Sequence, residues 1–163
     1  VNVNVNKKDS IKILKNFIQD LSFENPQNVN ENNSVNNNAN DININMDVIF
    51  KPYKNNFFSL ILKYTLDCSS KKNKKKLFNL ELDYFGFFEI LGKNNHDQKL
   101  LTEKGIKLLF PFCKEIIEDI TRKGGSIPIL LNEIDFKLEK DYIAPIVIHE
   151  EARAKALSAF KKI

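Results

Sequence analysis

The residue types that most often carry out catalysis are few in this 163-residue chain and lie far apart in the sequence. Cys68 and Cys113 have neither a CxxC spacing nor a histidine neighbour, which argues against a zinc site and against an activated thiol. His96 lies in a polar segment and His149 lies near the C-terminus, and neither has a partner at the spacing of metal ligands. The sequence therefore predicts no enzyme, no metal and no cofactor.

Two carboxylates, Asp20 and Glu24, are spaced so that they share one surface. On a strand, residues four positions apart lie on the same face, about 13 Å from each other at ~3.3 Å per residue. From composition alone this spacing indicates the polar face of an ordinary edge strand.

The positive charge of the chain is concentrated in one segment. A net charge of +4 would favour nucleic acid or an anionic membrane as a partner, but five of the six residues from Lys71 to Lys76 are lysine. This segment accounts for the whole excess, so no basic face is predicted. No stretch approaches the ~20 apolar residues of a membrane span, and Val1 to Asp9 lack the apolar core of a signal peptide. We expect a cytoplasmic protein without stable membrane insertion.

Four segments alternate apolar and polar residues with the period of two that is typical of β-strands. They span Ile13 to Glu24, Ile42 to Phe50, Phe58 to Leu66 and Leu80 to Tyr84. In the first, strict alternation places Phe17 on one side with Leu21 and Phe23, and Asp20 and Glu24 on the other. The short connections predict an antiparallel meander.

Three further segments differ from these strands. Gln27 to Asn40 is rich in asparagine and has little to bury, so it is predicted to be a flexible loop. Phe85 to Leu91 is apolar on both faces, so it is predicted either to be covered on both sides or to form a contact surface, and we expect an interface. Asp97 to Lys123 has helical spacing, with Gly124 and Gly125 as its end; Pro111 fits either its first turn or a break after a shorter helix at Leu100 to Lys107.

A second helix is predicted at about 148–163, which gives the order of four strands followed by two helices. The chain is thus expected to be a single α+β domain over residues 1–163, with a four-stranded antiparallel sheet and a core at about 12–138.

Three blocks in that order resemble the SecB family of protein-export chaperones. They are IQDLSFENP at Ile18 to Pro26, LFNLELDYFGFFEI at Leu77 to Ile90, and LLFPFCKEIIEDITRKGGSIPILLNEIDF at Leu108 to Phe136. The resemblance covers about Lys12 to Leu138. It implies a homotetramer, built as a dimer of dimers, that binds unfolded preproteins without ATP as a holdase and delivers them to the SecA translocation motor.

The resemblance also implies roles for particular residues. Asp20, Glu24 and Glu81 match the positions that bind SecA, although the residue two before Glu81, usually apolar in the family, is Asn79 here. Candidates for the hydrophobic groove that binds clients are Phe57, Phe85, Phe87 and Phe88. Candidates for the subunit interface are Leu80, Leu82 and Tyr84. For both sets, burial in the core of one chain is the alternative.

Other functions remain open from the residues. A nucleic-acid module could hold phosphates with the Lys71 to Lys76 loop and stack bases on Phe58 and Tyr64, but these aromatic residues lie on the face where the helix should pack. We therefore expect no nucleic-acid partner. A SecB-like chaperone dedicated to a toxin system and a purely structural adaptor are the two remaining alternatives.

Overall fold

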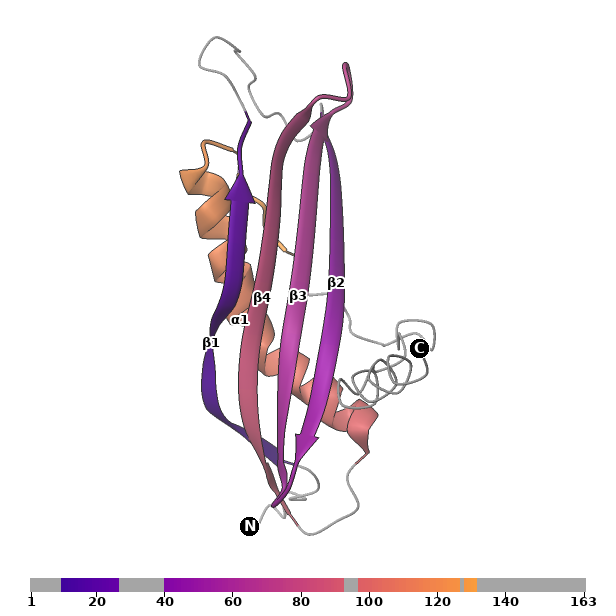
Figure 1. Cartoon of the computed structure of the whole chain (residues 1–163), viewed down its shortest axis with the longest axis vertical. Helices are drawn as coiled ribbons and strands as arrows, with labels where there is room; N and C mark the ends of the chain where they lie inside the picture. The colour runs from indigo at the N-terminus through magenta and orange to yellow at the C-terminus, as the bar shows by residue number, and fades with distance from the viewer. Residues whose placement is uncertain (1–9, 27–39, 93–96, 127, 132–163) are drawn as a thin grey trace, which may run out of the picture.

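The computed structural model describes residues 10–26, 40–92, 97–126 and 128–131. This part of the chain contains strands β1 (Ser10–Glu24), β2 (Asn40–Tyr53), β3 (Phe57–Ser70) and β4 (Lys76–Leu91), followed by helix α1 (Gln98–Lys123). The strands form one antiparallel sheet, and α1 crosses it diagonally on one side (Figure 1). The predicted α+β class is confirmed. The predicted helix at about 148–163 and residues 27–39 of the predicted loop lie outside the described residues; Asn40 begins β2.

The order of the strands in the sheet is β1-β4-β3-β2, so the predicted meander is wrong for β1. Short turns join β2 to β3 and β3 to β4, and these pairs are neighbours as expected. At the first turn Asn55 and Asn56 take φ angles of 63° and 62°, a conformation that asparagine tolerates well. The connection from β1 to β2 is much longer. Its length leaves β1 free to pair with β4 at the opposite side of the sheet.

Strand β4 continues without a break through Phe85–Leu91, the segment that is apolar on both sides. Residues Gly86 and Phe88 face α1, whereas Phe85 and Phe87 point to the other side of the sheet. This alternation explains the double apolar pattern, because one set of side chains belongs to the core beneath the helix and the other does not.

The core lies between the sheet and α1, where two glycines allow a close approach. A Cβ atom on Gly86 would lie 2.8 Å from Leu109 Cδ1, and a Cβ atom on Gly105 would overlap the side chain of Leu60. Strand β4 and helix α1 therefore each have a glycine, without a side chain, at the point where the other side of the core packs against it. The largest fully buried side chains are Tyr64, Phe58, Phe78, Phe88, Leu60, Leu62, Leu66, Leu80, Leu82, Ile106, Leu109 and Ile117.

Helix α1 is continuous through Pro111, so both predicted positions of this proline, in a first turn or at a break, are wrong. Proline removes one backbone hydrogen bond and disfavours the helix interior. Here Leu109 and Cys113, on either side of it, are fully buried against the sheet, and their packing outweighs that local cost. Among the described residues, no helix is both long and apolar enough to cross a membrane.

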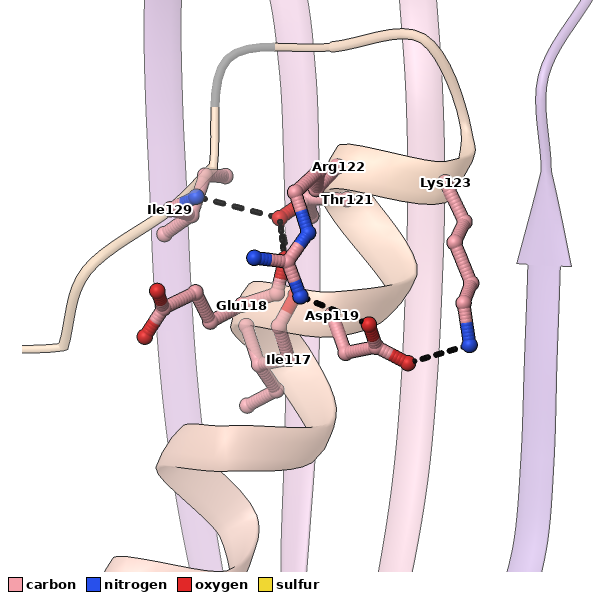
Figure 2. A network of polar contacts seen from close by, with 7 residues as sticks. All are labelled: Ile117, Glu118, Asp119, Thr121, Arg122, Lys123 and Ile129. Atoms are coloured by element: carbon pink, nitrogen blue, oxygen red, sulfur yellow. Dashed lines mark hydrogen bonds and ion pairs between the residues drawn. The ribbon is translucent and has the colours of Figure 1, made fainter.

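The end of α1 is tied to the chain that follows it (Figure 2). The buried hydroxyl of Thr121 donates a hydrogen bond to the Ile117 carbonyl at 2.8 Å and accepts one from the Ile129 N–H at 3.0 Å. On the exposed side, hydrogen bonds from Lys123 and Arg122 lower the pKa of Asp119. Thr121 therefore fixes the direction in which the chain leaves the helix.

Replacing Thr121 with valine should lower the free energy of unfolding by about 1–3 kcal/mol, because the buried N–H of Ile129 loses its acceptor. Thr121→Ser keeps the hydroxyl and should cost less. Urea denaturation followed by circular dichroism measures both variants. A valine variant as stable as the wild type would show that this hydrogen bond contributes nothing.

Candidate functional site

The sheet has one face that α1 does not cover, which we call the open face; Figure 1 looks onto it, with α1 behind the strands. Because side chains opposite each other on antiparallel strands point the same way, the strand register assigns residues to this face in rows. Counted from the C-terminal end of β1 toward its N-terminal end, three acidic rows are followed by three aromatic rows. The acidic rows are Glu24-Asn79-Asp67-Asn43, Ser22-Glu81-Thr65-Asn45 and Asp20-Asp83-Lys63-Asp47. The aromatic rows are Phe17-Phe85-Ile61-Ile49, Lys15-Phe87-Ser59-Lys51 and Lys12-Glu89-Phe57-Tyr53.

The structure brings the three predicted carboxylates together within the acidic rows. Glu81 on β4 lies opposite Ser22 of β1, so Asp20 and Glu24 flank it diagonally, at the ~7–8 Å typical of such neighbours. All three side chains are exposed. They form one group of negative charges on a rigid sheet.

Further carboxylates strengthen the negative charge of these rows. Asp83 lies opposite Asp20 and forms an ion pair with Lys63 at 2.9 Å. The hydrogen bond to Asp83, followed by the charges of Asp83, Asp20 and Asp47, raises the pKa of Lys63. This ammonium group neutralises only part of the carboxylates around it.

Asn79, the departure from the family pattern, also lies in the acidic rows. Its side-chain amide donates a hydrogen bond to Asp67 Oδ1 at 2.6 Å, across to β3. The amide thus orients a carboxylate in the row next to Glu81.

A β-bulge in β1 determines which side chains reach the open face. The register shifts between Ile18 and Asp20, so the strict alternation predicted for this strand is wrong. Phe17 shares the open face with Asp20, whereas Ile18, Leu21 and Phe23 face α1. The alternation of residue types gives no sign of this bulge, since only the pairing with β4 reveals it.

The aromatic rows gather side chains from all four strands. The Phe17 and Phe85 rings have centroids 4.9 Å apart, and Phe87 contacts Phe57 at 5.6 Å and Tyr53 at 5.5 Å. Three of the predicted groove residues, Phe57, Phe85 and Phe87, therefore lie on one surface. Phe17 and Tyr53 are two members that the sequence analysis missed.

Two lysines lie over these rings. Lys15 Nζ is 5.2 Å from the centroid of Phe17, and Lys51 Nζ is 5.3 Å from that of Tyr53. At these distances the ammonium groups are attracted to the ring faces. The aromatic rows are thus bordered by positive charge, in contrast to the acidic rows beside them.

A pocket of about 360 Å³ lies at the turn between β2 and β3, at the edge of the aromatic rows. Tyr53 and Phe57 line it together with Phe58, Ile90 and Leu101. Phe58 and Ile90 face α1 and Leu101 belongs to it, so the pocket lies on the helix side of the sheet, and only Tyr53 and Phe57 connect it to Phe87 and the aromatic rows.

Phe88, the fourth groove candidate, lies on the other side of the sheet. Its side chain is 0% exposed and stacks on Phe58 with ring centroids 4.8 Å apart beneath α1. The interface candidates Leu80, Leu82 and Tyr84 are buried on the same side. In the single chain these four residues belong to the core.

A separate group of apolar side chains is exposed on α1 and β1. Leu108 and Phe112, which are adjacent on the helix surface, are 39% and 41% exposed, and Leu14 and Ile18 of β1 are also exposed. Phe112 stacks on Tyr84, the residue opposite Ile18. We call these four exposed side chains the lateral patch.

The cysteines and the aromatic residues of the nucleic-acid alternative are buried. Burial raises the pKa of the Cys113 thiol to about 12 and also raises that of Cys68, so both thiols stay protonated and pack as small apolar groups. Phe58 and Tyr64 are covered by α1 and cannot stack on bases. That alternative loses the surface it requires.

Comparisons with known proteins agree with the fold. The family model described as "Preprotein translocase subunit SecB" matches residues 4–139. A protein-export protein SecB of Agrobacterium fabrum is 39% identical over 147 residues, covering 90% of this chain and 88% of that protein. The corresponding protein of Orientia tsutsugamushi (strain Boryong) is 31% identical over 128 residues, covering 77% of this chain and 78% of that protein.

A solved structure shares the fold at much lower sequence identity. It is a SecB-like chaperone of Mycobacterium tuberculosis in complex with a ChAD peptide from an antitoxin, with a TM-score of 0.60 and 11% identity, and the match covers 75% of this chain and 88% of that one. Together with the family match and the identities above 30%, this similarity leads to one conclusion. The chain belongs to the SecB family of protein-export chaperones.

Proposed function

We propose that this protein is an ATP-independent holdase that binds unfolded preproteins and delivers them to the SecA motor. The observation that carries the proposal is the open face, where an apolar surface for clients adjoins a cluster of carboxylates. A monomeric protein rarely leaves a large apolar surface exposed unless the surface binds something.

Client binding is assigned to the aromatic rows and the adjoining pocket. Phe57, Phe85 and Phe87 offer apolar area to an extended segment, and burial is worth roughly 25 cal/mol per Å² of apolar surface. This driving force has no directional requirement, so it accepts many sequences and needs no nucleotide.

Docking to the motor is assigned to Asp20, Glu24 and Glu81. In SecB family members these positions receive the basic, zinc-bearing tail of SecA, and here they are exposed and adjacent. Exposed carboxylates attract a basic segment chiefly through electrostatic interaction over a distance. Salt at 0.1–0.15 M screens this attraction over ~8–10 Å.

A homotetramer, as a dimer of dimers, is proposed for the assembly. The lateral patch supports it, because Leu108 and Phe112 would lose contact with water against a second copy. Leu80, Leu82 and Tyr84 would contribute by shaping the sheet and helix beneath this patch, since they are buried within one chain.

A chaperone dedicated to a toxin system is the second candidate. The Mycobacterium tuberculosis chaperone with its antitoxin peptide suggests it, but at 11% identity that similarity concerns the fold alone. The relatives at 31–39% identity are named protein-export proteins, which favours preproteins as clients.

The holdase proposal predicts that the purified protein suppresses aggregation of a chemically unfolded client at near-stoichiometric ratio. Adding ATP should change nothing, because the binding is driven by apolar burial. Light scattering of the diluted client measures the effect, with bovine serum albumin at equal mass as control. Aggregation that proceeds unchanged at an excess of chaperone would refute the proposal.

Charge reversal in the acidic rows should weaken docking of the motor. Glu81→Lys is expected to raise the Kd of a SecA tail peptide at least tenfold, since it removes an attraction and adds a repulsion. Glu103→Lys on α1 makes the same change of charge on the other side of the sheet and serves as the control. Fluorescence anisotropy measures both, and light scattering checks that the assembly is intact. Equal Kd values for the two variants would exclude this site.

A further inference from the structure

A group of lysines lies at one end of the sheet. The turn from β3 into β4 contains five lysines within residues 71–76, which we call the lysine turn. It lies at the top of the molecule in Figure 1, at the opposite end of the strands from the turn between β2 and β3. Lys71, Lys72 and Lys74 are exposed. Several ammonium groups are thus presented together at one tip of the molecule.

Hydrogen bonds hold the backbone of the lysine turn in one conformation. The N–H of Ser70 donates to the Lys75 carbonyl at 2.9 Å, and the N–H of Lys74 donates to the Ser70 carbonyl at 2.9 Å. The side chain of Asn73 accepts a further bond from the Lys75 N–H at 3.1 Å. Because these contacts already order the backbone, a partner that binds the lysines does not have to order it.

Two carboxylates offset part of this positive charge. Lys74 Nζ lies 3.0 Å from Asp41 Oδ2, and Lys76 Nζ lies 4.0 Å from Asp67 Oδ1. The four side chains are all more than 40% exposed, so water and salt weaken both pairs. Five lysines against two carboxylates leave a local charge of +3.

The rest of the acidic rows is too distant to cancel this charge. Glu81 follows Lys76 by five residues along β4, which is about 17 Å at ~3.3 Å per residue. Charges at a protein surface are screened over ~8 Å at 0.15 M salt. At physiological salt the lysine turn therefore acts on a partner as a separate positive region, although the same sheet carries negative charge.

We propose that the lysine turn docks the protein, tip first and without insertion, on an anionic lipid surface. The cations of the turn are all lysine, and residues 69–76 include neither an arginine nor an aromatic residue. Arginine is the residue suited to bidentate recognition of phosphate, and aromatic rings are what single-stranded nucleic acids stack on. Lysine is a hydrated point charge, and clustered lysines are attracted by the diffuse negative potential of lipid headgroups.

The charges of the open face determine how the protein stands on the lipid. Asp20, Glu24 and Glu81 are repelled by an anionic surface, so the open face does not lie flat on it. The strands then stand away from the surface, and the open face stays accessible. This docking goes beyond the proposed function, because the lysine turn contains none of the residues assigned to clients or to the motor.

The test measures cosedimentation of the full-length protein with lipid vesicles. The protein should bind phosphatidylcholine vesicles that contain about 30% phosphatidylglycerol, should be released by raised salt, and should not bind pure phosphatidylcholine. Replacing Lys71 and Lys72 together with glutamine should lower the partition coefficient roughly thirtyfold, which corresponds to ~1 kcal/mol per lysine.

The matched control removes the same charge elsewhere. Lys54→Gln together with Lys99→Gln changes two exposed lysines, one in the turn between β2 and β3 and one in the first turn of α1. This variant should keep most of the binding. Asp41→Asn should raise the partition coefficient about fivefold, because it releases Lys74 from its carboxylate at little cost to stability.

Equal partition coefficients for the two double variants, or equal binding to anionic and neutral vesicles, would overturn the inference. So would tighter, lysine-dependent binding of double-stranded RNA or of polyglutamate than of the anionic vesicles, in favour of a nucleic acid or an acidic protein as partner. The aggregation assay separates these failures from failure of the proposed function. A protein that suppresses aggregation but ignores anionic vesicles would refute the inference alone, and the converse result would refute the holdase alone.

Discussion

Replacing Phe88 with alanine should lower the free energy of unfolding by about 3–5 kcal/mol, the usual cost of truncating a buried phenylalanine. The Phe88 ring is fully buried, stacks on Phe58 and lies beside Gly105 under α1, so its loss leaves a cavity that the backbone cannot easily close. Urea denaturation followed by circular dichroism measures the change.

The adjacent residue provides the control. Phe87→Ala removes the same atoms from the open face, where the ring is partly exposed, and should cost ~1 kcal/mol, near the centre of measured values for point mutants. Phe87→Ala should cost more free energy of client binding than free energy of unfolding. If the two variants proved equally stable, Phe88 would not be a core residue, and it would return to the groove candidates.

Introducing aspartate at both Leu108 and Phe112 should dissociate the proposed homotetramer. These residues are exposed in the single chain, and an interface that covered them would have to bury two unpaired carboxylates, which costs several kcal/mol per ion. Light scattering should report a mass close to the 18.9 kDa of one chain instead of that of the wild-type assembly.

Lys99→Asp is the matched control for this variant, since it introduces aspartate at an exposed position in the first turn of α1, where a negative charge suits the helix dipole. It should leave the mass unchanged. A double variant that keeps the wild-type mass and a folded spectrum would show that subunits meet elsewhere. A wild-type protein that is itself monomeric would remove the dimer of dimers from the proposal.

Local periodicity was enough to predict the four strands and the helix that the structure describes, but not their arrangement. The alternation in β3 and the helical spacing between Leu109 and Ile117 reflect which side chains are buried. Both patterns can be recognised within one short segment of the sequence. The neighbour of β1 depends on which distant strand offers matching side chains, so the short-connection rule failed once the connection was long. Pro111 was misjudged because propensity ignores the packing on either side of it.

The candidate site was predictable in some of its residues and not in its geometry. Asp20, Glu24 and Glu81 came from a family resemblance, and their adjacency follows from the pairing of β1 with β4. Phe17 was assigned to the wrong side because a shift of one residue reverses the face of every side chain beyond it, and residue types alone do not mark a bulge. Phe87 and Phe88 are identical in type, so only the sheet and helix around them separate a surface residue from a core residue.

The separation of Glu81 from Phe87 along β4 is about 20 Å at ~3.3 Å per residue, which is twice the screening length at 0.1 M salt or more. In the proposed function, the carboxylates would attract a basic segment before it touches the rings, and the rate of association would depend on the salt concentration. The bound segment would leave at a rate set by how much of its apolar surface must be rehydrated over Phe17, Phe85 and Phe87. In the proposed function, capture would therefore depend on the acidic rows and residence time on the aromatic rows of the same sheet.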